Sequence, residues 1–427
     1  MARKMKDSGI EWIGEIPEGW EVTPVRSCFD EVRTKNTDGQ EQNALQFKSG
    51  NIISKTNFSA STDDYVADTI TNYTVVLPDT VMINGLNLNY DFKSLRVALV
   101  KEKGVITSAY LAIFPDRKKI SPQYATYLFK GYETKMAFHN MGAGIRKTLG
   151  YKEFKNQPLL LPSKEEQNKI SAYLDSKCSH INIMLSKTRS SIEEYKKLKQ
   201  AVITQAVTKG VRGEREMKDS GVDWIGEIPV DWEISRIKYV SIFEPSCDFR
   251  KLTPETIITY SPMECIKNGT FERRTSLYGN LAHTLTPFQN GDIVMAKVTP
   301  CFENGNIAIM NELQSGYGLG SSELFVFRPQ NINTRYLFYW LQNKLFVHQA
   351  CATMTGTGGL KRISPSFVKN CNIHYPSTAE QAQIAAYLDA KCAEIDKLIA
   401  KKEHLVKELE GYKKSLIYEV VTGKREV

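Results

Sequence analysis

The sequence lacks the features that mark several large classes of protein. None of its eight cysteines lies in a CxxC pair or at a spacing from histidine that would build a zinc site. No apolar run approaches the roughly 20 residues that a membrane span needs, and the first residues lack the apolar region of a signal peptide. We therefore expect reduced thiols, no metal site, no membrane contact and a cytoplasmic location.

Motifs of catalysis are also absent. The chain contains no GxxxxGK[ST] phosphate loop, no HExxH, no GxSxG and no Pro-Pro pair, the last being part of the motif expected in an adenine methyltransferase. One nuclease-like set occurs, Asp116 followed by Glu133 and Lys135. Glu133 falls in a stretch with a helical pattern, whereas metal ligands of this kind should sit on adjacent strands. We therefore predict no catalytic residue.

Charge and composition allow a nucleic-acid partner without identifying one. Of the 427 residues 41% are hydrophobic, which is enough for two or three domains with their own cores. The 56 Lys and Arg residues exceed the 48 Asp and Glu residues, so the formal net charge is +8. A mild positive excess of this kind suits a polyanion but is common in other proteins.

The sequence contains an internal duplication. Residues 5–22 read MKDSGIEWIGEIPEGWEV and residues 217–234 read MKDSGVDWIGEIPVDWEI, identical at 13 of 18 positions. A second match joins residues 165–181 to residues 379–395, with 10 of 17 identical. The period is far longer than the roughly 20–50 residues of solenoid repeats, so the architecture is a doubled domain. We predict boundaries at 1–162, 163–210, 211–376 and 377–427, the first and third being globular heads and the others long helices.

The two helical segments have the local signals of long coiled-coil helices. Prolines precede them, Ser163 in the first and either Ser377 or Thr378 in the second are available as N-caps, acidic residues follow in the first turn, and Gly210 and Gly423 end them. Apolar residues recur at alternating steps of three and four, which predicts an antiparallel coiled coil about 60 Å long with one head at each end. The predicted seam comprises Ile170, Leu174, Ile181, Leu198, Ile384, Leu388, Ile395, Leu398, Leu405, Leu409 and Leu416.

Each head is predicted to be a mixed α/β domain. Short apolar runs such as LRVALV, YLAIF, DIVMAKV and ELFVF alternate with turns rich in Gly, Asn and Pro, which is typical of strands. A helical pattern follows in each head, at residues 122–138 and 334–349.

Candidate DNA contacts occur at equivalent positions of the two heads. The stretches GAGIRK (residues 142–147) and GTGGLKR (residues 356–362) combine glycines, which let a phosphate approach the backbone, with cations. A tight structural turn explains the same glycines equally well. The DNA-binding candidates are Gly142, Gly144, Arg146, Lys147, Gly356, Gly358, Lys361 and Arg362, together with Arg273 and Arg274, which lie near two aromatic residues.

The repeated segment supplies four tryptophans, Trp12, Trp20, Trp224 and Trp232. The segment is too short to fold alone, so these side chains either anchor it onto a head or a helix or dock a partner protein. We keep them as partner-docking candidates.

The motifs together closely resemble the specificity subunit of type I restriction-modification systems. Two copies of DSGxxWIGEIPxxW each lead into a variable domain, a proline turn and EQxxIxAYLDxKCxxI, and the second copy ends in VVTGK. The resemblance implies that two target-recognition domains each read one half of an asymmetric site in double-stranded DNA, while the coiled coil sets their spacing. It also implies docking of two methyltransferase (modification) subunits and of restriction/motor subunits. S-adenosylmethionine, ATP and Mg would belong to those partners, and this chain would be a non-catalytic subunit without a cofactor.

Two other classes of function stay open at this point. A coiled-coil scaffold that does not bind DNA would show no salt-dependent affinity for DNA. A stand-alone nuclease or methyltransferase would cut or methylate DNA without partners, and the missing motifs argue against it.

Overall fold

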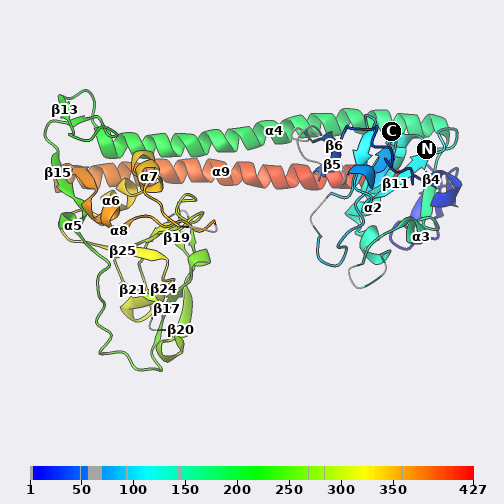
Figure 1. Cartoon of the computed structure of the whole chain (residues 1–427). Coiled ribbons are helices and arrows are strands. Elements are labelled where there is room, and N and C mark those ends of the chain that lie inside the picture. Colours follow the sequence, from blue (N-terminus) through cyan, green and yellow to red (C-terminus); the bar gives the residue numbers. More distant parts are fainter. Residues whose placement is uncertain are drawn as a thin grey trace. The chain divides into compact units, whose positions relative to one another are not determined.

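Each half of the duplicated sequence forms its own unit in the computed structural model, together with a helical segment from the other half. Unit 1 comprises Met1–Arg189 and His404–Val427, and unit 2 comprises Ser190–Glu403 (Figure 1). The structure describes residues 3–48, 50–55, 70–92, 95–142, 144, 147–267, 269–282, 284–356 and 359–427.

The core of unit 1 is built on an antiparallel sheet with apolar side chains on both faces. Its strand order is β4 (Phe29–Glu31), β11 (Leu111–Pro115), β8 (Val81–Ile83) and β9 (Val97–Leu99). Because side chains alternate along a strand, Val81 and Ile113 face helix α2 (Pro122–Thr134), whereas Met82 and Ala112 belong to a second cluster on the other face. Ser121 caps α2 and Pro122 starts it, as both residue types favour.

The other elements of unit 1 pair as two-stranded sheets or form short helices. The repeated segment forms a hairpin in which Lys6 lies opposite Ile16, and β3 then pairs with β12. The elements are β1 (Met5–Asp7), β2 (Glu15–Pro17), β3 (Glu21–Pro24), η1 (Val25–Ser27), β5 (Leu45–Lys48), β6 (Asn51–Ser54), β7 (Thr74–Val76), β10 (Gly104–Ile106), η2 (Ala137–Asn140), α3 (Tyr151–Phe154) and β12 (Pro158–Leu161).

Unit 2 repeats this plan and has a further four-stranded sheet. The sheet equivalent to that of unit 1 has the order β16 (Ser241–Phe243), β25 (Leu324–Pro329), β22 (Ile293–Ala296) and β23 (Ile307–Ile309). The further sheet has the order β20 (Arg274–Leu277), β17 (Ile257–Ser261), β24 (Tyr317–Gly320) and β21 (Thr286–Gln289). The other elements are β13 (Met217–Asp219), β14 (Glu227–Pro229), β15 (Glu233–Arg236), α5 (Ile237–Val240), η3 (Met263–Cys265), β18 (Ile266–Lys267), β19 (Thr270–Phe271), η4 (Tyr278–Asn280), η5 (Gln314–Gly316), α6 (Thr334–Trp340), α7 (Lys344–Ala352), α8 (Pro365–Asn370) and β26 (Asn372–Tyr375).

The predicted helix at residues 334–349 is two helices. Helix α6 ends at Trp340, and α7 begins after Asn343, whose side chain accepts a hydrogen bond from the backbone N–H of Phe346 at 2.9 Å. An asparagine that caps a new helix explains the break, because its side chain satisfies a backbone donor that the first helix cannot.

The two long helices are confirmed as α4 (Lys164–Lys209) and α9 (Thr378–Val421). They run antiparallel within each unit: Asn182 contacts Lys413 and Arg189 contacts Glu410 in unit 1, as Tyr195 contacts Lys402 and Lys199 contacts Asp396 in unit 2. No helix in the described part of the chain is long and apolar enough to cross a membrane.

The seam between these helices differs in part from the prediction. Leu198 and Leu405 are 48% and 42% exposed, so they are not seam residues. Counting in steps of three and four from the buried Leu185 and Ile192 leads to Lys199 rather than Leu198. Among the other predicted positions, Leu398 and Leu409 are half-buried, and the following are buried: Ile170, Leu174, Ile181, Ile384, Leu388, Ile395 and Leu416.

A buried histidine in unit 2 gives the first prediction. His374 in β26 is 1% exposed, and burial lowers the pKa of its imidazole, while the backbone of Ser220 acts in the opposite direction. Leu160 takes the equivalent place in unit 1. Since the fold favours neutral imidazole, the stability of unit 2 should fall as the pH drops through the ordinary histidine pKa.

His374→Leu should therefore stabilise unit 2 by on the order of 1 kcal/mol at pH 8 and by more at pH 5.5. Urea unfolding at the two pH values measures this. The reciprocal variant Leu160→His is the control, and it should make unit 1 newly sensitive to acid. An equal gain from His374→Leu at both pH values would contradict the titration argument.

Candidate nucleic-acid interface

The two glycine loops occupy equivalent places in the two units. In unit 1 the backbone N–H of Leu88 donates to the carbonyl of Lys147 at 3.1 Å, which fixes the loop beside the segment that follows β8. In unit 2 the N–H of Thr299 donates to the carbonyl of Lys361 at 3.0 Å, beside the segment that follows β22. Thr355 and Arg362 exchange two further backbone bonds and close the second loop as a hairpin.

Three of the predicted glycines are needed for the turns themselves. A Cβ on Gly142 would lie 2.7 Å from Leu88 Cδ1, and one on Gly356, where φ is 142°, would lie 2.3 Å from the carbonyl oxygen of Leu360. A Cβ on Gly144 would meet nothing within 4 Å, but its φ of 82° lies in the left-handed region that favours glycine. The turn interpretation thus explains Gly142 and Gly356 by close contacts and Gly144 by its backbone conformation. Arg146 and Gly358 lie outside the described residues.

The predicted cations fall into two groups. The ammonium groups of Lys147 and Lys361 are exposed and form no ion pair with any described residue. The three arginines are already paired with carboxylates: Arg273 with Glu312, Arg274 with Glu272 and Glu264, and Arg362 with Glu323 at 2.6 Å. A paired arginine must exchange its carboxylate for a phosphate, so the two lysines are the stronger candidates for phosphate contact.

The pair between Arg362 and Glu323 has a visible electrostatic effect. Hydrogen bonds from the Arg362 guanidinium hold the pKa of the Glu323 carboxyl below its ordinary value. The carboxylate therefore stays charged, and it would oppose a phosphate that approached Arg362.

Trp20 and Trp232 are core residues, which corrects their prediction as docking residues. Each is 1% exposed, so neither can present its ring to a partner. Trp12 and Trp224 are half-buried against the cores of their units. The ring of Trp12 packs edge-to-face on Tyr132 at 4.7 Å, which fixes the repeated segment on α2.

A set of matched polar contacts joins each head to its long helix. These contacts are not among the residues predicted from the sequence. The side chain of Gln167 accepts from the N–H of Ser121 at 2.7 Å, and that of Gln381 accepts from the N–H of Asn333 at 2.8 Å. The hydroxyl of Tyr127 donates to Asp175 at 2.7 Å, and that of Tyr339 donates to Asp389 at 2.8 Å. These glutamines and aspartates lie within the identical positions of residues 165–181 and 379–395, which was the available signal.

The first turn of each long helix is tied by an equivalent ion pair to an arginine two residues before the repeated segment. Arg3 contacts Glu166 in unit 1, and Arg215 contacts Glu380 at 2.6 Å in unit 2. Glu380 is 1% exposed and also lies at a helix N-terminus, where the dipole favours its charge. Much of the identity between the two copies thus maintains the attachment of head to helix.

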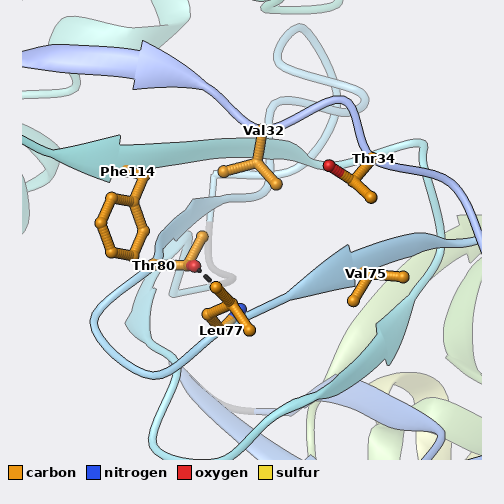
Figure 2. Close-up of a pocket in the computed structure, with 6 residues that line it drawn as sticks. All are labelled: Val32, Thr34, Val75, Leu77, Thr80 and Phe114. Carbon is orange, nitrogen blue, oxygen red and sulfur yellow. Dashed lines mark hydrogen bonds between the residues drawn. The ribbon is translucent and has the colours of Figure 1, made fainter. Parts of the chain in front are cut away.

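A small hollow in unit 1 has no acid, base or metal ligand in its lining. Figure 2 shows its side chains: Val32, Thr34, Val75, Leu77, Thr80 and Phe114, which enclose about 290 Å³. The Thr80 hydroxyl accepts from the N–H of Leu77 at 3.2 Å.

In the nuclease-like set, Glu133 lies in helix α2, and its carboxylate accepts from the backbone N–H of Arg96. Among the described residues, no three His, Cys, Asp or Glu side chains could together hold a metal ion.

Several known proteins with similar sequences are specificity subunits of type I restriction enzymes. Residues 229–408 match the type I restriction modification DNA specificity domain. The specificity subunits of the type I restriction enzymes EcoEI and EcoAI from Escherichia coli are 32% and 34% identical over 163 residues, 37% of this chain and 27% of each relative. This chain therefore matches only about a quarter of the length of those relatives. The MjaVIII specificity subunit from Methanocaldococcus jannaschii is 24% identical over 423 residues, which is 96% of this chain and 93% of the relative.

The fold is also that of a solved chain from a study of complex assembly and conformational transition of the type I R-M system. That chain has a TM-score of 0.68 at 15% identity, and the match covers 96% of this chain and 99% of that chain. The doubled α/β fold with paired helices is thus the architecture that the two chains share. In sequence, the chain is similar to the specificity subunits of type I restriction-modification systems, and the DNA specificity domain of that family is matched at residues 229–408.

The head-to-helix contacts give the second prediction. Gln381→Ala would leave the buried N–H of Asn333 and the carbonyl of Pro376 without their partner, so unit 2 should lose about 2–4 kcal/mol of stability. Differential scanning calorimetry measures the loss. Gln383→Ala, on an exposed position of the same helix, is the matched control and should change the stability by less than about 0.5 kcal/mol. Equal effects of the two variants would contradict a structural role of the buried amide.

Proposed function

We propose that this chain is the DNA sequence-specificity subunit of a type I restriction-modification complex, in which each unit reads one half of a split, asymmetric site. The observation that carries the proposal is that repeated residues and divergent residues have different roles in the structure. Identical residues in the two copies maintain the attachment of each head to its helix, whereas the described parts of the two heads differ in strand content. Two domains that recognise different half-sites but attach to their helices in the same way need this arrangement.

The chemistry of modification and cleavage is proposed to belong to partner subunits. Two methyltransferase subunits would supply the S-adenosylmethionine chemistry, and restriction/motor subunits would supply the ATP- and Mg-dependent steps. A surface that occurs once in each unit suits two identical partners. Trp12 with the exposed Glu15, and Trp224 with the exposed Glu227, are the positions we propose for that docking.

The direct test is binding and methylation by the purified chain and by its complex. The chain alone should bind double-stranded DNA with an affinity that falls as salt rises, and it should neither methylate nor cut DNA without partners. In the complex, mapping of methylated adenines should reveal a site with two unlike halves. Methylation or cleavage by the isolated chain, or a continuous palindromic site, would contradict the proposal.

Lys147 and Lys361, which form no ion pair with any described residue, give the third prediction. Lys147→Ala and Lys361→Ala should each weaken binding on every DNA sequence and flatten the dependence of log K on log salt concentration by about one unit. Titrations at several salt concentrations measure the slope. Arg273→Ala, whose guanidinium is held by Glu312, is the control and should change the slope less. An unchanged slope in both lysine variants would assign the loops a structural role alone.

The paired helices give the fourth prediction, since we propose that they set the gap between the half-sites. One heptad inserted after Ile181 and another after Ile395 would keep the seam paired while adding about 10.5 Å to each helix. The gap should grow by up to about three base pairs, at about 3.4 Å each, with both half-site sequences unchanged. Methylome mapping reads both quantities. A heptad in one helix alone should impair assembly, and altered half-sites with an unaltered gap would refute the spacing role.

A further inference from the structure

The segment that follows β8 in unit 1 presents two aromatic rings to solvent. Tyr90 is 73% exposed and Phe92 is 57% exposed, although both belong to a head with a well-packed core. Phe92 stacks on the ring of His139 with centroids 5.1 Å apart and planes 11° apart, so its orientation is fixed. Aromatic rings that contribute little to a core but are held in place are typical of contact surfaces.

A buried arginine holds this segment from beneath. The guanidinium of Arg96, which is 1% exposed, donates to the carbonyls of Asn84 and Leu86 at 2.9 Å and also to the carbonyl of Asp91. The backbone N–H of Arg96 donates to the carboxylate of Glu133 on helix α2. One side chain therefore fixes three carbonyls of the segment, which lowers the entropy that a partner must remove on binding.

The charges and polar groups around the rings favour a polyanion as the occupant. The Asp91 carboxylate lies 3.9 Å from the guanidinium of Arg96, so its charge is compensated. Lys147 is joined to the segment through its carbonyl, and its ammonium forms no ion pair in the described part of the chain. The backbone of Asn87 adopts a φ of 52° and turns the segment, and its side chain is exposed. Amides hydrogen-bond to base edges, and aromatic rings contact thymine methyl groups.

We propose that residues 84–92 are the base-contacting element of unit 1. Asn87, Tyr90 and Phe92 contact base edges of one half-site, and Lys147 contacts the adjacent phosphate. This inference rests on the proposed function and adds to it the residues that determine specificity. The equivalent segment of unit 2 carries Phe302, which is 3% exposed, so unit 2 reads its half-site with other residues.

The test uses the chain together with its modification subunits in a host cell. The methylated motif of the unmodified chain is first determined by single-molecule sequencing of genomic DNA. Tyr90→Ala and Phe92→Ala are then mapped in the same way. Each should make positions of one half-site degenerate, with about a tenfold or greater loss of preference for the original bases, while the other half-site stays intact.

Purified chains provide a second readout that separates base contact from general binding. On a duplex carrying the mapped site and on a shuffled duplex, the two variants should lose affinity for the former by about tenfold and for the latter by less than about twofold. Tyr239→Ala is the matched control, since Tyr239 is 63% exposed in unit 2, and it should leave the half-site of unit 1 unchanged. Thermal melting should show that both variants of unit 1 stay folded.

Three results would overturn the inference in different ways. Unchanged motifs in both variants would remove Tyr90 and Phe92 from base recognition, and with them the basis for assigning residues 84–92, while leaving the proposed function intact. Retained DNA selectivity with loss of co-purified modification subunit would show that the rings bind a protein. If the unmodified chain showed no preference for any duplex and no split motif, the proposed function itself would fail.

Discussion

The fold depends on the packing of each repeated segment against the end of a helix from the other half of the chain. In unit 1 a Cβ on Gly423, just past α9, would lie 2.3 Å from Pro17 Cδ and 3.3 Å from Trp20 Cη2. In unit 2 a Cβ on Gly210, just past α4, would lie 3.5 Å from Trp232 Cζ2. Both glycines adopt the left-handed conformation that ends a helix, with φ of 71° and 79°. In unit 1 the helix end thus packs too closely on the repeated segment to admit a side chain at Gly423, and in unit 2 the end of α4 lies in contact with Trp232.

Much of the fold could be predicted from the sequence because the repeat and the heptads are local patterns. The N-caps at Ser163 and Ser377 also follow from local rules. Their hydroxyl oxygens accept hydrogen bonds from the backbone N–H groups of Glu166 and Glu380. The seam was less predictable. Its register includes Lys199, whose apolar stem lies in the interface while its ammonium reaches Asp396. A heptad pattern that is traced through leucines therefore selects Leu198 instead of Lys199.

The candidate interface was predictable only in outline. Equivalent loops in two copies identified the places of Lys147 and Lys361, but the pairing of Arg362 with Glu323 joins residues 39 positions apart and depends on tertiary structure. Burial of Trp20 likewise depends on the end of a helix some four hundred residues later. The aromatic segment after β8 was missed because Tyr90 and Phe92 look like core residues in a sequence, and only the buried Arg96 beneath them shows otherwise.

The division of the chain into units also fixes the order in which a ribosome completes them. Unit 2 consists of one continuous stretch, Ser190–Glu403, so all of its parts have been synthesised by the time residue 403 is added. Unit 1 requires His404–Val427, which is made after all of unit 2, although the head of unit 1 is made before unit 2. The first head must therefore wait, with the apolar surface around Trp20 uncovered, while some two hundred further residues emerge. During synthesis all segments of unit 2 are therefore present before those of unit 1, and we expect the nascent first head to need protection from aggregation in that interval.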